Sequence, residues 1–279
     1  MRIIQNPELM LKLARQVRLE RKKIGLVPTM GALHQGHLSL IQKARQENDF
    51  TVVSIFVNPA QFGPREDFKK YPRPFKEDLR LCRKEGVDVV FSPVIAKMYP
   101  ARHKTYVMVK NLSDILCGRS RPGHFTGVAT IVTKLFNIVQ PDRAYFGQKD
   151  AQQAIIIKRM TSDLNMPLKI RVLATVRHKD GLAMSSRNSY LNKQERKDAL
   201  VLWKSLQLAK LLIKNGARDA KRIIRSMRMV LKKKKSLKIE YIAIVDSHAL
   251  RPVTRVAKGD LITLAAWVGR TRLIDNLIV

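Results

Sequence analysis

Short apolar runs alternate with segments of helical periodicity along the first 175 residues of the chain. The runs typical of buried strands cover residues 24–27, 51–57, 87–91, 143–146 and 169–175. Between them, apolar residues recur at helical spacing over residues 38–45, 75–85, 127–139 and 150–164. Strands that alternate with helices predict an α/β architecture, in which a parallel sheet carries helices on both faces.

The first element after the N-terminus is a predicted helix. Asn6 is a favourable N-cap, and Pro7 suits the first helical position. The apolar residues that follow predict a buried helix face made of Leu9, Leu13, Val17 and Leu19.

The pattern changes after about residue 176. Residues 193–213 and 219–231 have helical periodicity, and residues 237–245 and 260–268 are strand-like. Helices followed by strands are typical of a small α+β domain. We therefore predict two domains, residues 1–176 and 177–279, with a hinge at residues 177–181. The alternative is one continuous domain whose C-terminal part departs from the α/β pattern.

Composition narrows the class of protein. The 279 residues, 45% of them hydrophobic, are ordinary for a globular protein with one large or two modest domains. No apolar run approaches the roughly 18 residues of a membrane span, and the first residues lack signal-peptide features. Cys82 and Cys117 have neither disulfide nor metal-ligand spacing. These features predict a cytoplasmic protein without a membrane partner, in which Cys117 is a reactive thiol or, as we favour, a small buried hydrophobe.

The net charge of +32 is unusual. Residues 218–238 carry ten lysines and arginines against one acid, Asp219. Such a segment either binds RNA or an acidic membrane, or is a solvated helix and turn. Only 6% of the residues are aromatic, and no series of stacking aromatics accompanies the charge. We favour the solvated surface, with nucleic-acid affinity limited to non-specific attraction at low salt.

Residues 30–37 combine two glycines with two histidines between a predicted strand and a predicted helix. In a parallel α/β unit such a turn lies at the carboxyl end of the sheet, where ligands bind. Glycine allows close approach of the backbone, and the start of a helix offers unpaired N–H groups to a phosphate. A lone histidine is more often structural, but His34 and His37 together favour phosphate binding.

Further polar clusters follow other predicted strands. Asn58 and Gln61 are uncharged hydrogen-bonding groups that suit a substrate with hydroxyls and a carboxylate, although an ordinary turn has the same composition. Arg121 can clamp a carboxylate or a phosphate, with His124 orienting it. Lys149 is placed to meet phosphate charge beside Asp150, which is otherwise a helix cap.

Two more positions complete the set of candidate residues. Gln153 lies three residues beyond Asp150, one turn into a predicted helix, and can face the same pocket. Ser185, Ser186 and Arg187 form a second predicted phosphate clamp at the start of a helical region, for which a plain serine N-cap is the alternative.

These segments, in this order, resemble the pantoate–β-alanine ligase family of the nucleotidylyl-transferase superfamily. The spacing His-x-Gly-His is similar to the signature of the superfamily, and the whole string of residues 28–37 is similar to that of the family. The resemblance extends over nearly the whole chain, through residues 54–59, 61–64, 66–67, 71–73, 121–125, 147–150, 152–153, 180–188 and 271–276.

The resemblance implies a ligase reaction in two steps. The carboxylate of pantoate attacks the α-phosphate of Mg-ATP, which gives pantoyl adenylate and pyrophosphate. The amine of β-alanine then attacks the acyl carbon, which gives pantothenate and AMP. The family also implies a Rossmann-like first domain, a smaller lid domain and a homodimer. Mg²⁺ is expected to be held by ATP oxygens and water, because the sequence contains no dedicated carboxylate cage.

The resemblance also implies roles for individual residues. His34, His37 and Lys149 stabilise the α- and β-phosphates, with His37 the nominal proton donor. Gln61 and Gln153 bind pantoate, and Gln61 also contacts β-alanine. The implied ATP-binding set is Met30, Gly31, Ala32, Leu33, His34, Gln35, Gly36, His37, Gly147, Gln148, Lys149, Asp150, Val176, Met184, Ser185, Ser186 and Arg187.

Two residues depart from the family pattern. His178 stands where many members carry Glu, which alters the electrostatics of the predicted hinge, and Cys117 stands where some carry Glu, which weakens the expectation of a carboxylate near Arg121. Two alternative functions remain open: another nucleotidylyl-transferase that uses the same turn, and a basic RNA-binding protein that reuses the fold.

Overall fold

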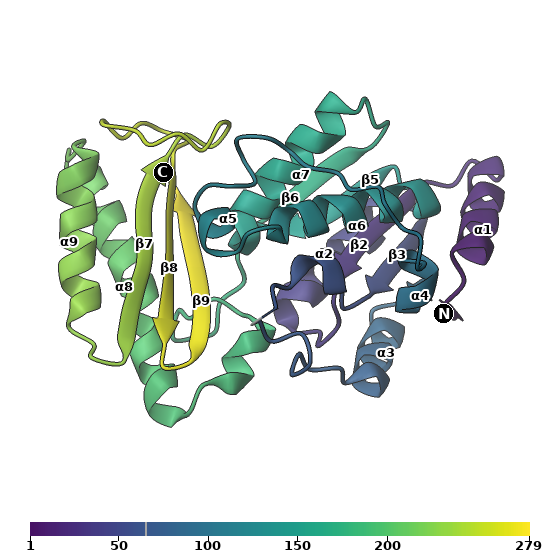
Figure 1. Cartoon of the computed structure of the whole chain (residues 1–279), viewed down its shortest axis with the longest axis horizontal. Helices are drawn as coiled ribbons and strands as arrows, with labels where there is room; N and C mark the ends of the chain where they lie inside the picture. The colour runs from purple at the N-terminus through teal and green to yellow at the C-terminus, as the bar shows by residue number, and fades with distance from the viewer. Residues whose placement is uncertain (65) are drawn as a thin grey trace. The chain divides into compact units, whose positions relative to one another are not determined.

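The computed structural model describes residues 1–64 and 66–279 and divides into two compact units. The first unit comprises Met1–Gly147 and Gln153–Ala174, and the second comprises Gln148–Gln152 and Thr175–Val279 (Figure 1). The short segment Gln148–Gln152 therefore belongs with the second unit, although it directly follows a strand of the first. That residues 1–176 and 177–279 are separate domains stays a prediction.

The first unit contains a six-stranded parallel sheet in the order β1-β4-β3-β2-β5-β6. This sheet confirms the predicted α/β class. The prediction omitted the edge strand β1, because three residues are too few to show a periodicity. The strands are β1 (Arg2–Ile4), β2 (Ile24–Thr29), β3 (Phe50–Ile55), β4 (Val89–Phe91), β5 (Arg143–Gly147) and β6 (Lys169–Leu173).

Helices connect the strands of this sheet. The long helices are α1 (Pro7–Leu19), α2 (Gln35–Glu47), α3 (Phe75–Lys84), α6 (His124–Val139) and α7 (Ala151–Asp163). Short helical turns are η1 (Pro59–Gln61), α4 (Ile95–Met98), α5 (Cys117–Ser120) and η2 (Gln148–Asp150). Helices α2 and α3 bury their apolar residues in one cluster with the sheet, which includes Leu38, Ile41, Leu79, Val27, Val53 and Tyr145.

The predicted buried face of α1 is partly wrong. Asn6 caps this helix as expected, since its side chain accepts from the amide of Glu8. The buried residues are Met10, Ala14 and Val17, whereas Leu9 and Leu19 are 58% and 85% exposed. The small Ala14 lies in the centre of a stripe that packs against α6, and this stripe is too narrow to include Leu9 and Leu19.

The strand order reverses direction between β2 and β5, which lie side by side. From β2 the chain proceeds to β3 and β4 on one side, and from β5 it proceeds to β6 on the other. In open parallel sheets, ligands bind outside the carboxyl ends of the strands at such a switch point. The chain leaves these two strands at Met30 and Gln148, which begin two of the segments that the sequence marks for phosphate binding.

The C-terminal end of α2 is anchored to the sheet by Glu47. Its carboxylate accepts hydrogen bonds from Arg171 on β6 at 2.7 Å and from the hydroxyl of Tyr145 on β5 at 3.0 Å. Lys43, one turn earlier on α2, lies 3.1 Å from the same carboxylate. The hydrogen bond from Arg171 lowers the pKa of Glu47 to about 2. These contacts fix the helix whose other end carries His37.

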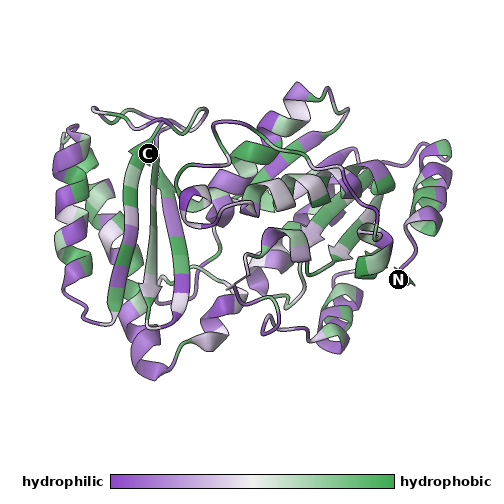
Figure 2. Ribbon diagram, viewed as in Figure 1, coloured by the Kyte–Doolittle hydropathy of each residue, from purple (hydrophilic) through white to green (hydrophobic). Residues whose placement is uncertain are grey.

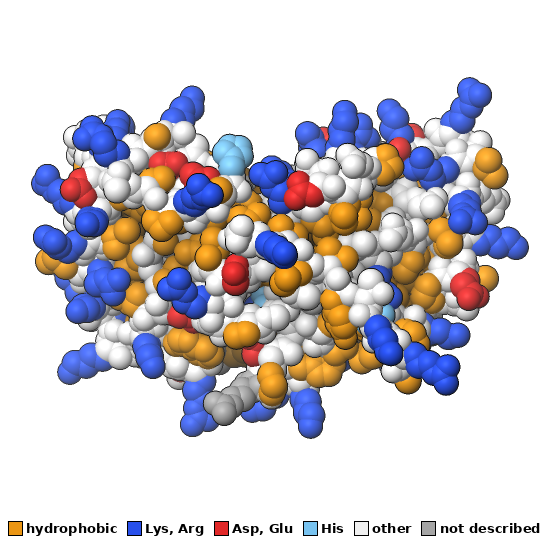
Figure 3. Space-filling view, turned by 45° about the horizontal axis from the view of Figure 1, so that its top comes forward, with side chains coloured by type: hydrophobic (Ala, Val, Ile, Leu, Met, Phe, Trp, Pro, Cys, Tyr) orange, Lys and Arg blue, Asp and Glu red, His pale blue; other side chains and the backbone are white. Residues whose placement is uncertain are grey.

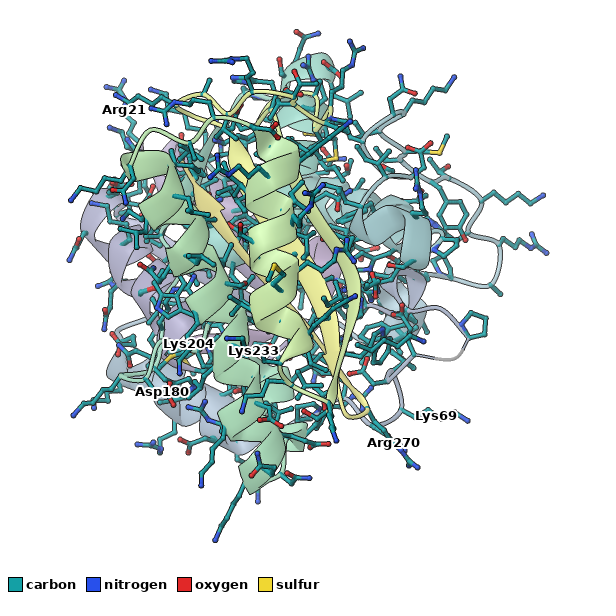
Figure 4. All side chains as sticks on the ribbon, turned by 90° about the vertical axis from the view of Figure 1, so that its left-hand side faces the viewer. Arg21, Lys69, Asp180, Lys204, Lys233 and Arg270 are labelled. Carbon is teal, nitrogen blue, oxygen red and sulfur yellow. The ribbon has the colours of Figure 1, made fainter. Side chains whose placement is uncertain are left out.

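The second unit is an antiparallel sheet of β7 (Leu237–Val245), β8 (Leu261–Val268) and β9 (Thr271–Ile278), in that order. Helices α8 (Lys193–Lys214) and α9 (Ala220–Lys232) lie side by side across the sheet (Figure 4). This confirms the predicted α+β class. The strand pattern of β9 alternates buried and half-buried positions, and the prediction omitted it.

Helix α9 separates apolar and basic residues clearly. Ile223, Met227 and Leu231 are buried in the core of the unit, and the basic residues lie on the exposed side (Figure 2). Lysines and arginines are scattered over the molecular face seen in Figure 3 and do not form one cluster there. Among the described residues, no helix is long and apolar enough to cross a membrane.

Candidate active site

The turn of residues 30–37, here called the histidine turn, is shaped by a buried carboxylate. Gly31 and Ala32 have left-handed backbone conformations, with φ of 81° and 50°. The amides of Ala32 and Leu33 donate to the Asp78 carboxylate at 2.9 and 2.8 Å. A Cβ at Gly31 would lie 2.8 Å from Asp78 Oδ2, so both the φ angle and the close approach require glycine.

Asp78 lies on α3 and is 1% exposed. Its burial raises the pKa of the carboxyl, and the two backbone hydrogen bonds from the histidine turn oppose that shift. The carboxylate therefore accepts hydrogen bonds from two amides of the turn that would otherwise have no acceptor. Sequence reasoning missed this residue, because a lone acid in the first turns of a helix is usually solvated.

The amides at the start of α2 are also occupied. Gly36 donates to the side chain of His34, and the amides of His37 and Leu38 donate to the His34 carbonyl. The sequence predicted that unpaired amides here bind a phosphate, and for these three amides that prediction is wrong. His34 is thus the N-cap of α2, and its ring and its carbonyl accept from these three amides.

The two imidazoles share one orientation. Nδ1 of His34 accepts from the Gly36 amide at 3.1 Å, and Nδ1 of His37 accepts from the His34 amide at 3.3 Å. The rings lie against each other with centroids 4.1 Å apart. An acceptor Nδ1 places the proton of a neutral imidazole on Nε2. In its neutral form each ring is thus an N–H donor at Nε2, a group that suits a phosphate oxygen.

Gln61 and Asn58 differ in how their amides are used. Asn58 is 1% exposed, donates to Gln61 Oε1 and to the Gly127 carbonyl, and accepts from the hydroxyl of Tyr99 at 2.8 Å. Gln61 Nε2 donates to the sulfur of Met30 at 2.9 Å. A thioether is a weak acceptor, so a ligand oxygen would replace it favourably. The geometry favours Gln61 as a substrate contact and Asn58 as the residue that positions it.

The backbone around Asn58 permits no additional bulk. A Cβ at Gly127 on α6 would overlap the carbonyl of Ala60 in η1. Glycine therefore allows α6 to approach the segment that carries Gln61, and the bond from Asn58 to the Gly127 carbonyl fixes this contact.

Arg121 binds a carboxylate of the protein itself. Its guanidinium forms a two-pronged ion pair with Glu66, with distances of 2.6 and 2.5 Å. Burial alone would raise the pKa of Glu66, but the hydrogen bonds and charge of Arg121 outweigh it and the pKa is lowered. His124 completes the cluster, with Nδ1 2.8 Å from the Gln61 carbonyl. Glu66, not position 117, supplies the carboxylate near Arg121, which favours a positioning role for this arginine.

The segment after β5 belongs to the second unit. Lys149 is about one-fifth exposed, and its Nζ lies 3.3 Å from the Asp150 carboxylate. Asn276 on β9 donates to the carbonyls of Gln148 and Lys149 at 2.9 and 2.8 Å. Asp150 ends a short 3-10 turn just before α7.

The predicted hinge is a braced turn. The amide of Met184 donates to the carbonyl of Val176 at 3.0 Å, and the amide of His178 donates to the carbonyl of Leu182 at 2.9 Å. Arg177 forms a two-pronged ion pair with Asp275 at 2.7 and 2.8 Å. This bracing argues against flexibility at residues 177–181.

The predicted phosphate clamp follows the braced turn. Ser185 caps the short helix η3 (Ser186–Tyr190) by accepting from the amide of Arg187 at 3.3 Å. The structure therefore contains the serine N-cap that the sequence left as the alternative. Residues 184–187 are all half-buried, as a ligand-binding segment requires.

The described part of the chain contains potential metal ligands and two cysteine thiols. Residues 1–64 and 66–279 contain no group of three or more histidines, cysteines or acids that could hold a metal ion. Cys82 and Cys117 are both buried, and burial raises the pKa of Cys82 to about 12. Both cysteines are thus small buried hydrophobes in the described structure.

Enzymes of the Rossmann-like α/β class combine a switch point of this kind with polar side chains on the turns that leave it. The chain is an enzyme of this class. Comparison with known proteins narrows the class to one family: the sequence profile of pantoate–β-alanine ligases matches residues 2–278. The chain therefore belongs to the pantoate–β-alanine ligase family.

Individual relatives agree along the whole chain. The pantothenate synthetase of Thermotoga neapolitana is 54% identical over 279 residues, with both sequences fully covered. Among solved structures, the pantothenate synthetase of Thermus thermophilus is 42% identical, with a TM-score of 0.95 and coverage of 100% of this chain and 99% of that one. The pantoate–β-alanine ligase of Francisella tularensis, complexed with beta-gamma ATP and β-alanine, is 34% identical, with a TM-score of 0.81 and coverage of 100% and 97%.

Proposed function

We propose that this chain joins pantoate to β-alanine through a pantoyl-adenylate intermediate, with ATP as the source of the adenylyl group. The observation that carries the proposal is the pair of adjacent imidazoles at the switch point, whose Nδ1 atoms both accept from backbone amides, so that Nε2 carries the proton of each neutral ring. Two neutral donors side by side suit the α-phosphate, where negative charge is rearranged when a carboxylate attacks. The complex of the Francisella relative with beta-gamma ATP and β-alanine supports the choice of ligands.

In the first step, the pantoate carboxylate attacks the α-phosphorus and pyrophosphate leaves. His34 and His37 donate hydrogen bonds to α- and β-phosphate oxygens, and Lys149 supplies a positive charge for the same groups. Ser185, Ser186 and Arg187 bind the β- and γ-phosphates. A neutral imidazole stabilises the transition state without attracting the attacking carboxylate away from phosphorus.

Pantoate is held through uncharged amides. Gln61 donates to a pantoate oxygen in place of the Met30 sulfur, and Gln153 on α7 binds the same substrate. Asn58 donates to Gln61 Oε1, and Arg121, which Glu66 holds, donates to the Gln61 carbonyl at 3.4 Å. These contacts keep the Gln61 segment in position. Amide donors leave the carboxylate nucleophilic, whereas a full ion pair would weaken its attack.

In the second step, the amine of β-alanine attacks the acyl carbon of the adenylate and AMP leaves. Mg²⁺ would arrive bound to ATP oxygens and water, because this ion usually keeps several waters and needs at most one or two protein carboxylates. The proposal also includes a homodimer, as the family resemblance implies, and a cytoplasmic location, as composition and cysteine usage predict.

The test is pantothenate formation by the purified chain from pantoate, β-alanine and Mg-ATP, with each component omitted in turn. ATP–pyrophosphate exchange that requires pantoate but not β-alanine would support the adenylate. Exchange that is indifferent to pantoate would indicate another nucleotidylyl-transferase. Product formation without any exchange would overturn the intermediate.

A further inference from the structure

The segment 271–276 resembles the family pattern but has no role in the proposed chemistry. It forms most of β9, and it ends with two buried polar residues, Asp275 and Asn276, which are 2% and 4% exposed. Neighbouring residues of a strand direct their side chains to opposite faces of the sheet. Buried polar groups in such positions require hydrogen-bonding partners, and the partners show what the two residues do.

Asn276 holds the backbone that carries Lys149. Its Nδ2 donates to the carbonyls of Gln148 and Lys149 at 2.9 and 2.8 Å, and its Oδ1 accepts from Gln148 Nε2 at 3.1 Å. Two successive carbonyls bound by one amide fix the peptide unit between them. They therefore fix the direction in which the Lys149 side chain leaves the backbone.

Asp275 holds the turn that precedes Ser185 and Arg187. Its carboxylate binds both terminal nitrogens of Arg177, and Arg177 also donates to the carbonyl of Gly181 at 3.1 Å. The guanidinium lies 3.6 Å from the ring centre of Trp203 on α8. Arg177 is thus fixed by both its ion pair and its ring contact, and its turn is fixed with it.

We propose that Asn276 is a positioning residue for Lys149, and that Asp275 and Asn276 together make β9 a shared support for the two phosphate-binding segments of the second unit. All of these contacts lie within that unit. The inference rests on the proposed role of Lys149 in charge stabilisation. In this proposal the 271–276 segment, which lies on β9, positions both Lys149 and the clamp of residues 184–187.

Asn276→Asp tests the proposal by changing a donor into an acceptor of the same shape. At neutral pH the carboxylate faces two carbonyl oxygens and repels them. We expect kcat of pantoate-dependent ATP–pyrophosphate exchange to fall about a hundredfold, the scale of misplacing a catalytic group, while KM for pantoate stays within about twofold. At acidic pH the protonated carboxyl can donate to one carbonyl, so the ratio of variant to wild-type kcat rises.

Asn192→Asp is the matched control. Asn192 is the exposed N-cap of α8 in the same unit, and aspartate caps a helix equally well. The substitution adds the same charge without touching β9. We expect wild-type kcat at every pH.

Two measurements separate a positioning role from a merely structural one. In a double-mutant cycle, Asn276→Ala should cost little once Lys149→Ala is present, because both changes remove the same contribution. Hydrogen exchange should show lost protection of residues 147–152 in Asn276→Ala, whatever the chain catalyses. If the wild type lacks ligase activity, the proposed function fails while the exchange result still tests the support of this backbone.

Three results would overturn the inference. The first is unchanged protection of residues 147–152 in a folded Asn276→Ala protein. The second is full additivity of Asn276→Ala and Lys149→Ala in kcat. The third is an Asn276→Asp protein whose activity relative to wild type does not vary with pH.

Discussion

At the scale of the residue, His34 and His37 each perform two tasks with one ring. Nδ1 accepts from a backbone amide at the start of α2, and Nε2 of the neutral ring is the proposed donor to the phosphate. Serine or aspartate caps a helix at least as well, but neither offers a second, neutral N–H donor. We therefore expect that ligand binding, more than helix capping, is the reason for histidine at these two positions.

Two substitutions separate these tasks at His37. Asparagine places an amide near the Nδ1 position, and glutamine places one near Nε2. We expect His37→Asn to melt close to wild type but to lose about a hundredfold in adenylation rate, the scale of one preorganised donor. His37→Gln should retain more activity, and its stability should stay close to wild type, because glutamine at N3 of a capping box also accepts from the N-cap amide. Exchange kinetics and thermal melting measure both, and equal activity of the two variants would contradict the assignment.

Asp78 offers a second test at this scale. Asp78→Asn keeps the shape but directs an NH₂ group toward one of the two amides that the carboxylate accepts. We expect a loss of about 1–3 kcal/mol in the free energy of unfolding, the cost of an unsatisfied buried donor. Adenylation should fall as well, because the histidine turn loses its support. Denaturant unfolding of Asp78→Asn at wild-type stability would show that the carboxylate does not hold the turn.

At the scale of the element, Glu47 connects α2 to two strands and gives stability a pH dependence. Its pKa is about 2 when folded and near 4.5 when unfolded. Because the folded value is the lower one, the contribution is fully present above about pH 4.5 and is lost as the pH falls toward 2. Arg171 is half exposed, so solvent screening limits the contribution to about 1 kcal/mol.

The check is Glu47→Gln, with Glu20→Gln as a control at an exposed pair. Unfolding at pH 7 should show Glu47→Gln to be the less stable protein, and the difference from wild type should shrink as the pH approaches 2. Glu20 pairs with the exposed Lys22 on the surface, so its variant should follow the wild type. A difference that persists at pH 2 would rule out the ionised carboxylate as the cause.

The periodicity of the chain predicted most elements of the sheet and the helices, because buried strands and amphipathic helices leave local patterns. It failed where contacts are distant in sequence. The face of α1 that is buried depends on its contact with α6. The apolar residues of α1 alone therefore did not predict the buried stripe that contains Ala14. Glu66 and Arg121, or Asn276 and Lys149, are brought together only by the fold, so no local spacing reveals them.

The histidine turn was predicted in part from the sequence. Its residue types predicted a ligand-binding turn, and the tautomer of each ring follows from backbone geometry that the sequence does not display. The Gly36 amide at the helix start, which was expected to be unpaired, donates to His34, and Asp78 accepts from the amides of Ala32 and Leu33 in the preceding turn. A carboxylate 46 residues away decided which groups remain for the ligand.

At the scale of the whole molecule, the proposed phosphate clamp of residues 184–187 lies in the second unit. We expect ATP to protect the amides of residues 184–190 from hydrogen exchange. Residues 177–183 should be protected already without ATP, since hydrogen bonds and the Asp275 pair brace them. Arg187→Ala should reduce the protection by ATP and impair adenylation, because the clamp loses its charged group.

The control for lost charge is Arg228→Ala, on the exposed side of α9. It should leave both the exchange pattern and the activity unchanged, despite the same loss of one positive charge. Full ATP protection of residues 184–190 in Arg187→Ala would remove Arg187 from the clamp. Absence of ATP protection in the wild type would remove the clamp itself.

The imidazoles of His34 and His37 at the start of α2 can also serve as spectroscopic reporters. The ¹⁵N chemical shift of an imidazole nitrogen differs strongly between one that bears a proton and one that presents a lone pair. In ¹⁵N-labelled His34 and His37, the Nδ1 resonance would thus report the hydrogen bond at the start of α2. The Nε2 resonance would report ligand binding. Binding of a nucleotide should move the Nε2 signals and leave the Nδ1 signals in place, so that one spectrum reads folding and occupancy at once.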